Sequence, residues 1–107
     1  MILRVQPVHI YQMYIRIHRS AGCHEVVGIC DHELLGKTLS EGDLNVVISP
    51  EFFGSHLATE EEILAALRDC ENINMFGERC ISLAISHGFI DEDSCRMIAG
   101  VPHAIIL

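Results

Sequence analysis

The chain has 107 residues, of which half are apolar, and fifteen acidic residues against seven lysines and arginines give a formal net charge of -8. This length supports a single domain that buries about two thirds of the surface of the unfolded chain. The longest apolar run is far shorter than the roughly 20 residues of a membrane-spanning helix, and the negative charge disfavours contact with nucleic acid. We therefore expect a cytoplasmic protein without membrane contact or direct DNA binding, whose partner offers a basic protein surface.

The first third of the chain predicts two paired strands. Residues 1–12 form an N-terminal extension, which is an edge strand at most because Pro7 interrupts it. Apolar and polar residues alternate over residues 11–19, and this pattern is typical of a half-buried strand. Residues 24–31 are apolar on both faces, so we expect a central strand that pairs with the first one as a hairpin.

The middle of the chain predicts a short turn, a third strand and a surface helix. Residues 32–36 allow one helical turn, and residues 44–49 alternate like a strand with Leu44 and Ile48 directed inward. Thr59 and Glu62 then match a capping box, in which each side chain satisfies a backbone N–H of the other residue. The helix that follows carries a single apolar stripe, formed by Ile63, Leu64, Leu67 and Cys70.

Residues 74–88 predict a second helix, around which the domain is organised. Asn74 can cap its start and Gly88 can end it in the left-handed conformation. The apolar arc covers more than half of its circumference and leaves only a narrow polar strip of Glu78, Arg79, Ser82 and Ser86. We therefore expect this helix to lie enclosed between the sheet and the first helix, or between the sheet and a partner chain.

The C-terminal residues predict two more strands. Residues 95–99 form one strand, and residues 100–103 make a kinked approach to a final apolar strand at residues 104–107, inserted in the sheet. The order of the elements predicts an α+β fold over a single domain at residues 13–107. Its expected form is a two-layer domain: a small, mainly antiparallel sheet that starts with a hairpin and packs against two central helices.

Familiar catalytic and metal-binding motifs are incomplete in this chain. Lys37 follows Gly36 as in a phosphate loop, but Asp31 stands where that motif requires another glycine. Cys23 and Cys30 lie about 20 Å apart if a strand joins them, too far for one zinc ion. The five cysteines are odd in number and contain no C-x-x-C, so we expect reduced thiols that pack as small apolar groups. We expect no cofactor and no metal, although a metal site that includes a distant Cys or His stays open.

Two polar groups are candidates for binding: one formed by Asn74, Glu78 and Arg79, and His103 alone. Asn74 and Glu78 lie one helical turn apart and Arg79 lies across the polar strip, which suits either ordinary capping and surface pairing or a polar contact rimmed by apolar surface. His103 is held rigidly by Pro102 before a buried strand. It is either a core-edge histidine that donates to a backbone carbonyl or a titratable group of a site.

Five short segments together resemble a known family: residues 33–38 (ELLGKT), 41–44 (EGDL), 52–54 (FFG), Asn74 with residues 77–79 (GER), and 100–104 (GVPHA). In this order they are similar to the archaeal domain of unknown function 424 family, a group of small uncharacterised proteins. The resemblance covers about residues 13–107. It implies an archaeal source and a compact α+β fold, assigns no reaction, and associates the chain with translation through the genes that neighbour those of the family.

We therefore expect a non-catalytic protein- or ribonucleoprotein-binding module linked to translation or ribosome biogenesis. Its contact surface would include Lys37, Asn74, Glu78, Arg79 and His103. One alternative is a small enzyme with Glu78 or His103 as acid or base and Lys37 or Arg79 binding an anionic substrate, which requires these side chains to converge in one pocket. Another alternative is a homo-oligomer that closes over the second helix.

Overall fold

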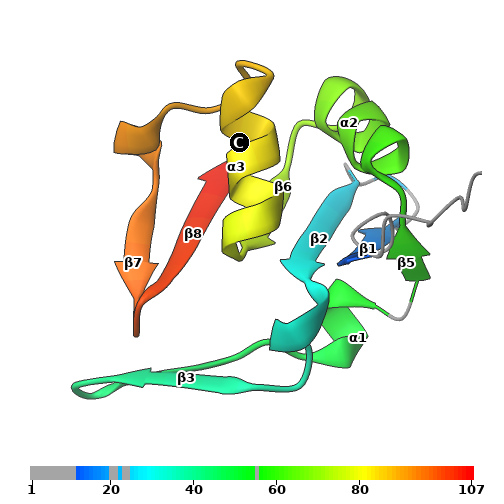
Figure 1. The fold of residues 1–107 in the computed structure, drawn as a ribbon. Coiled ribbons are helices and arrows are strands. Elements are labelled where there is room, and N and C mark those ends of the chain that lie inside the picture. Colours follow the sequence, from blue (N-terminus) through cyan, green and yellow to red (C-terminus); the bar gives the residue numbers. More distant parts are fainter. Residues whose placement is uncertain (1–11, 20–21, 23–24, 55) are drawn as a thin grey trace, which may run out of the picture.

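The computed structural model describes residues 12–19, 22, 25–54 and 56–107, and the expectations for residues 1–11, Cys23 and His24 lie outside these residues. Six strands form one mixed sheet in the order β5-β1-β2-β6-β8-β7 (Figure 1), where only β2 and β6 run parallel. Their bounds are β1 (Met13–His18), β2 (Val26–Asp31), β5 (His56–Ala58), β6 (Ile73–Phe76), β7 (Arg96–Ile98) and β8 (Val101–Ile106). An α+β fold is confirmed. Among the described residues, no helix has the length and apolar character needed to cross a membrane.

Two helices, α2 (Glu60–Asp69) and α3 (Glu78–Ser86), cover one face of the sheet. The main core lies between this face and the helices and includes the fully buried Val27, Ile29, Ile63 and Met75. Helix α2 presents its apolar side to this core, as its single stripe predicts, and leaves its acidic first turn in solvent. The predicted capping box is confirmed: Glu62 N donates to Thr59 Oγ1 at 3.2 Å and Thr59 N donates to Glu62 Oε1 at 3.2 Å.

Replacing Thr59 by alanine is expected to lower the free energy of unfolding by about 1 kcal/mol, since one backbone N–H of α2 then loses its cap. Urea denaturation of both proteins measures this loss. Ser40→Ala is the control, because that hydroxyl donates only to the exposed Asn45 side chain. A loss in Thr59→Ala no larger than that in the control would contradict the capping role.

The other face of the sheet carries a second, smaller core beneath α1 (Pro50–Phe53), a short 3-10 turn (His32–Leu34) and a ribbon of β3 (Thr38–Glu41) and β4 (Leu44–Val47). The two-layer expectation does not include these elements. The strand predicted over residues 44–49 is confirmed as β4, but it pairs with β3 and lies outside the six-stranded sheet. Ile48 at the base of the ribbon is fully buried, whereas Leu44 near its tip is 45% exposed. Only the base of the ribbon therefore reaches the core.

The predicted helix over residues 74–88 is correct only from residue 78 onward. Residues Ile73–Phe76 are the extended strand β6, so Asn74 is not a helix cap. A strand buried on both faces reads as a continuous apolar run, which periodicity cannot separate from a buried helix. The polar strip of Glu78, Arg79, Ser82 and Ser86 is exposed, so α3 is not enclosed on all sides. Gly88 has a φ of 78° and follows the end of the helix as predicted.

The C-terminal strands also differ in detail from the expectation. Strand β7 and the position of β8 inside the sheet are confirmed, but β8 begins at Val101, so Pro102 and His103 already belong to it. Pro102 pairs with Met97 in the short outer strand β7. The last apolar residues are buried on one side only, since Ile105 is 48% exposed.

Candidate functional site

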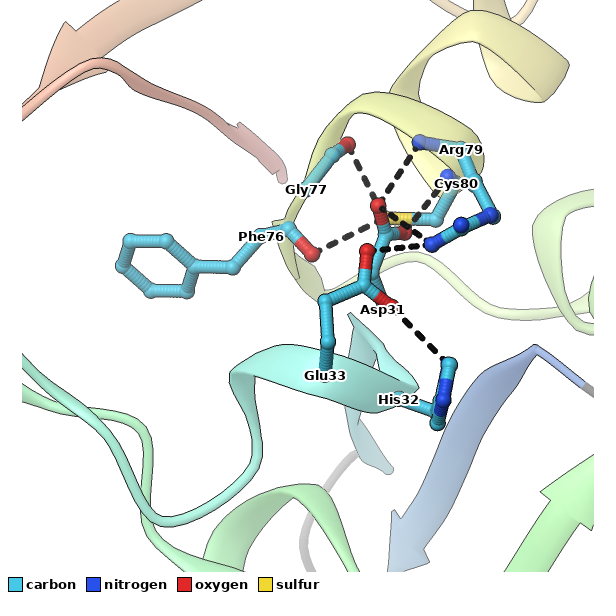
Figure 2. A network of polar contacts seen from close by, with 7 residues as sticks. All are labelled: Asp31, His32, Glu33, Phe76, Gly77, Arg79 and Cys80. Carbon is cyan, nitrogen blue, oxygen red and sulfur yellow. Dashed lines mark hydrogen bonds and ion pairs between the residues drawn. The ribbon is translucent and has the colours of Figure 1, made fainter.

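A buried carboxylate at the end of β2 caps the start of α3 (Figure 2). Asp31 is 2% exposed, and its two oxygens accept hydrogen bonds from the backbone N–H groups of Arg79 at 2.8 Å and Cys80 at 3.0 Å. The first N–H groups of a helix have no partner within the helix, and the cap residue Gly77 has no side chain to supply one. The parallel pairing of β2 and β6 brings the ends of both strands to the same edge, so Asp31 takes the role of the missing cap.

Gly77 allows this close approach. Its backbone has a φ of 120° and a ψ of 153°, a region that is essentially restricted to glycine. A Cβ at this position would lie 2.3 Å from Cγ of Asp31. The N–H of Gly77 donates to the carbonyl of Pro102 at 2.9 Å, which also ties the start of α3 to β8.

Arg79 connects this helix start to the turn that follows β2. Its guanidinium pairs with Glu33 Oε1, and Nη1 lies 3.9 Å from Asp31 Oδ2. The other oxygen of Glu33 lies 2.8 Å from His32 Nδ1. The side chains of Arg79 and Glu33 are 40% and 42% exposed, so this pair is a surface feature built over the buried Asp31.

The two carboxylates have opposite pKa shifts. Burial raises the pKa of Asp31 above its ordinary value, although the two backbone N–H groups of α3 act against this. Burial also acts to raise the pKa of Glu33, but the hydrogen bonds from its own backbone and from Arg79 outweigh this effect and lower it. The charged carboxylate at the surface is therefore Glu33, which Arg79 holds in a fixed position.

Two hollows flank Arg79. The first has a volume of about 300 Å³ and is lined by Asp31, Glu33, Glu78 and Arg79, with Pro102 among its apolar residues. The second has a volume of about 400 Å³ and lies along α3, where Arg79 is joined by Glu60, Ser82, Leu83 and Ser86. We call these two hollows, which share Arg79, the acidic groove. Of the residues that the structure describes, four carboxylates and one arginine line it.

The structure brings together only some of the predicted site residues. Glu78 and Arg79 line the acidic groove, whereas Lys37 lies at the base of the ribbon and lines neither hollow. Asn74 and His103 are on the opposite face of the sheet, with Asn74 Oδ1 at 2.8 Å from His103 Nε2. Asn74 is therefore not a neighbour of Glu78. Glu78 lines the first of the two hollows described above, and His103 lines neither of them.

His103 is held by side chains and not by the backbone carbonyl that we expected. Its Nδ1 accepts from Arg96 Nε at 3.3 Å, Nε2 faces Asn74, and its ring stacks on Phe76 with centroids 4.2 Å apart. Burial and the neighbouring Arg96 lower the pKa of His103, so the imidazole is neutral at neutral pH. This histidine is 5% exposed and serves as a rigid internal support.

The buried thiols are poor nucleophiles. Burial beside Asp31 raises the pKa of Cys30 to about 12, and burial also raises the pKa of Cys80 well above its ordinary value. Cys80 Sγ donates to the carbonyl of Phe76 at 3.2 Å. In the part of the chain that the structure describes, no group of three or more His, Cys, Asp or Glu side chains is placed to hold a metal ion.

Asp31, Glu33 and Glu60 were not among the predicted site residues. In the sequence, Asp31 was considered only as a departure from the phosphate-loop motif, and Glu33 only as the first residue of the segment 33–38. An acidic residue at the end of a strand that is otherwise buried on both faces could have pointed to Asp31 as a site residue, because a buried charge needs a partner. The partner is 48 residues further along the chain, and only the fold identifies it.

The fold and the groove together define a small α+β domain with a mixed sheet, α2 and α3 on one face, α1 and a two-stranded ribbon on the other, and a charged groove at the start of α3. The chain belongs to the family described as protein of unknown function (DUF424), whose model matches residues 18–107. It is also similar to the crystal structure of an uncharacterized conserved protein from Methanopyrus kandleri, with 27% sequence identity and a TM-score of 0.73. That similarity covers 88% of this chain and 89% of the other. A comparison with curated proteins found no match. The family resemblance seen in the sequence is thus confirmed.

Proposed function

We propose that this protein is a non-catalytic binding module whose acidic groove takes a basic segment of a partner protein. The observation that carries this proposal is the composition of the groove: Asp31, Glu33, Glu60 and Glu78 against the single Arg79. Lysine or arginine side chains of a partner would complement these carboxylates, and the apolar wall at Pro102 would contact their aliphatic stems.

The groove is suited to binding because much of it is already ordered. Asp31 fixes the start of α3, and Arg79 is held between Asp31 and Glu33. Groups that are held in place lose little freedom when a ligand arrives, so more of the interaction energy is available for affinity. Glu60 and Glu78 are exposed at the rim, where charges mainly speed association and select partners.

The proposed partner is a component of the archaeal translation or ribosome-assembly machinery. This part of the proposal is supported by the family resemblance and the gene neighbours associated with it. Protein segments that contact RNA are rich in lysine and arginine because they neutralise phosphates. A ribonucleoprotein partner would therefore present basic segments at its surface, and the acidic groove would bind the protein part of it.

The direct test is a titration with a fluorescent peptide that contains alternating lysine and arginine. The double variant Glu33→Gln with Glu78→Gln removes two groove charges and is expected to weaken binding roughly fivefold, since exposed charge pairs contribute about 0.2–1 kcal/mol each. The double variant Glu51→Gln with Glu61→Gln is the matched control, because both are exposed acidic residues, of α1 and α2, that do not line the groove.

Two outcomes would contradict the proposal. One is an equal loss of affinity in the control double variant Glu51→Gln with Glu61→Gln, since this would mean that only the net charge matters. The other is a pull-down from an archaeal lysate, performed with and without ribonuclease, that recovers no translation or ribosome-assembly protein in either condition. Circular dichroism of both double variants is the check that their fold is intact.

A further inference from the structure

A second surface lies on the sheet face opposite helices α2 and α3. Strand register places Asn74 of β6 beside Ile105 of β8, and Arg96 of β7 beside His103 of β8, all with side chains on this face. Leu107 follows Ile105 at the interval at which strand side chains return to one side. We call the surface formed by Asn74, Arg96, Ile105 and Leu107 the open sheet face.

Apolar side chains are exposed on the open sheet face although β8 is an interior strand of the sheet. β8 pairs with β6 on one side and with β7 on the other, yet its Ile105 is 48% exposed, and Leu107, which follows the last residue of β8, is 91% exposed. An apolar side chain in the middle of a sheet normally faces a core, so a cluster exposed there is typical of an interaction surface.

The neighbouring parts of the same sheet face are covered. Phe52 of α1 packs over Gly28 so closely that a Cβ there would lie 2.8 Å from its ring. The base of the ribbon covers Phe76 and Ile98, which are 3% and 2% exposed. Helix α1 and the ribbon therefore leave the upper part of β6, β8 and β7 uncovered (Figure 1).

The charge of this sheet face is opposite to that of the whole protein. The register puts Arg16 and Arg96 on this face of the six-stranded sheet, and only Arg96 lies within the open sheet face. The described residues of these six strands place no carboxylate on this face. Glu41 of the ribbon reaches only the turn between β7 and β8, where its Oε1 accepts from Ala99 N at 2.9 Å. The chain as a whole carries a net charge of -8. Arg96 is also held in place, because its Nε donates to His103 Nδ1 at 3.3 Å.

We propose that the open sheet face binds an amphipathic, acidic helix of a partner protein. Three strands about 4.8 Å apart offer a width close to the roughly 10 Å diameter of a helix. The apolar stripe of such a helix would cover Ile105 and Leu107, and glutamates or aspartates beside the stripe would pair with Arg96. This surface is separate from the acidic groove, so the protein joins a basic segment on one side to an acidic one on the other.

A single-stranded RNA is a less suitable occupant. Proteins that bind single strands stack bases on exposed aromatic rings. The aromatic ring of this region, Phe76, is 3% exposed and lies against His103. The strong negative charge of the whole chain also opposes a phosphate backbone.

The test is a fluorescence anisotropy titration of the full chain with a labelled helical peptide of Leu, Glu and Ala, in which leucines follow the i, i+3, i+4 pattern. Ile105→Glu is expected to weaken binding at least tenfold, and Ile105→Ser provides a second variant with no added charge. Met97→Glu is the matched control, because Met97 is 56% exposed but points to the other face of the sheet, and it should change binding less than twofold. In Arg96→Glu the preference should move toward a peptide that carries Lys in place of Glu.

Three results would overturn the proposal. The first is the absence of saturable binding to the acidic peptide, and the second is an equal loss of affinity in Ile105→Glu and Met97→Glu. The third is tighter binding of the Lys peptide than of the acidic peptide by the unchanged protein. A dimer seen by light scattering that Ile105→Glu dissociates would assign the face to a second copy of the chain. Binding of a poly-uridine oligonucleotide that Ile105→Glu abolishes would assign it to RNA. Thermal unfolding of every variant is measured as a control, to check that the fold is retained.

Discussion

Replacement of Gly77 by alanine is expected to lower the free energy of unfolding by about 4 kcal/mol. One part of this loss is backbone strain, because the φ of 120° and ψ of 153° at Gly77 are costly for any residue with a Cβ, by about 1–3 kcal/mol. The other part arises because the new Cβ would lie 2.3 Å from Cγ of Asp31. The carboxylate must then move away and loses its hydrogen bonds to the start of α3. Urea denaturation followed by circular dichroism measures the loss.

Gly88→Ala separates these two effects. Gly88 also has a positive φ, 78°, but a Cβ at this position would meet nothing within 4 Å. Its replacement should therefore cost only the backbone strain, about 1–2 kcal/mol. If both variants lose the same stability, the contact between Gly77 and Asp31 contributes nothing, and the description of Asp31 as the cap of α3 is wrong.

The elements predicted correctly from the sequence are those with local signals. The alternation in β1 and the capping box of α2 each depend on residues within one short segment, and both are confirmed. Gly88 likewise ends α3 because a left-handed residue is needed directly after the helix. Such signals act before any tertiary contact forms, so they can be recognised without the fold.

The boundary between β6 and α3 could not be predicted in this way. Ile73, Met75 and Phe76 are buried on two faces of a central strand, and their apolar run merges with the apolar residues of the helix. Gly77 marks the boundary, but a glycine inside an apolar pattern is compatible with a helix as well as with a break. The geometry that requires glycine here involves Asp31, which belongs to a different strand.

The prediction of the site is limited for the same reason, because residues that lie far apart in the sequence come together in it. Glu78 and Arg79 could be proposed because they stand on the polar strip of a helix, and the structure places both in the acidic groove. Asn74 was grouped with them only because a helical period was assumed, and a strand puts its side chain on the opposite face. Asp31 contributes to the groove through a contact between distant segments, for which the sequence contains no periodic signal.

Replacement of Asp31 by alanine is expected to cost about 3 kcal/mol, because the N–H groups of Arg79 and Cys80 lose their acceptor. Asp31→Asn should cost less, since the side chain keeps its shape and one acceptor oxygen, although its NH₂ group then faces one of these donors. Thermal unfolding of the two variants beside the unchanged protein gives both losses.

The pH dependence of stability distinguishes the unchanged protein, which has a carboxyl group at Asp31, from Asp31→Asn, which has a neutral amide there. Because burial raises the pKa of Asp31, the folded protein keeps the proton of this residue at pH values where the unfolded chain has already lost it. The contribution of Asp31 to stability is therefore complete below the ordinary carboxyl pKa, near about 3.9, and falls as the pH rises from there through the raised value. In Asp31→Asn this position does not titrate, so the stability advantage of the unchanged protein over the variant should shrink across this pH range and stay constant above it. An advantage that grows as the pH rises would mean that the two N–H groups of α3 outweigh burial, and that the folded protein holds Asp31 as the charged carboxylate throughout.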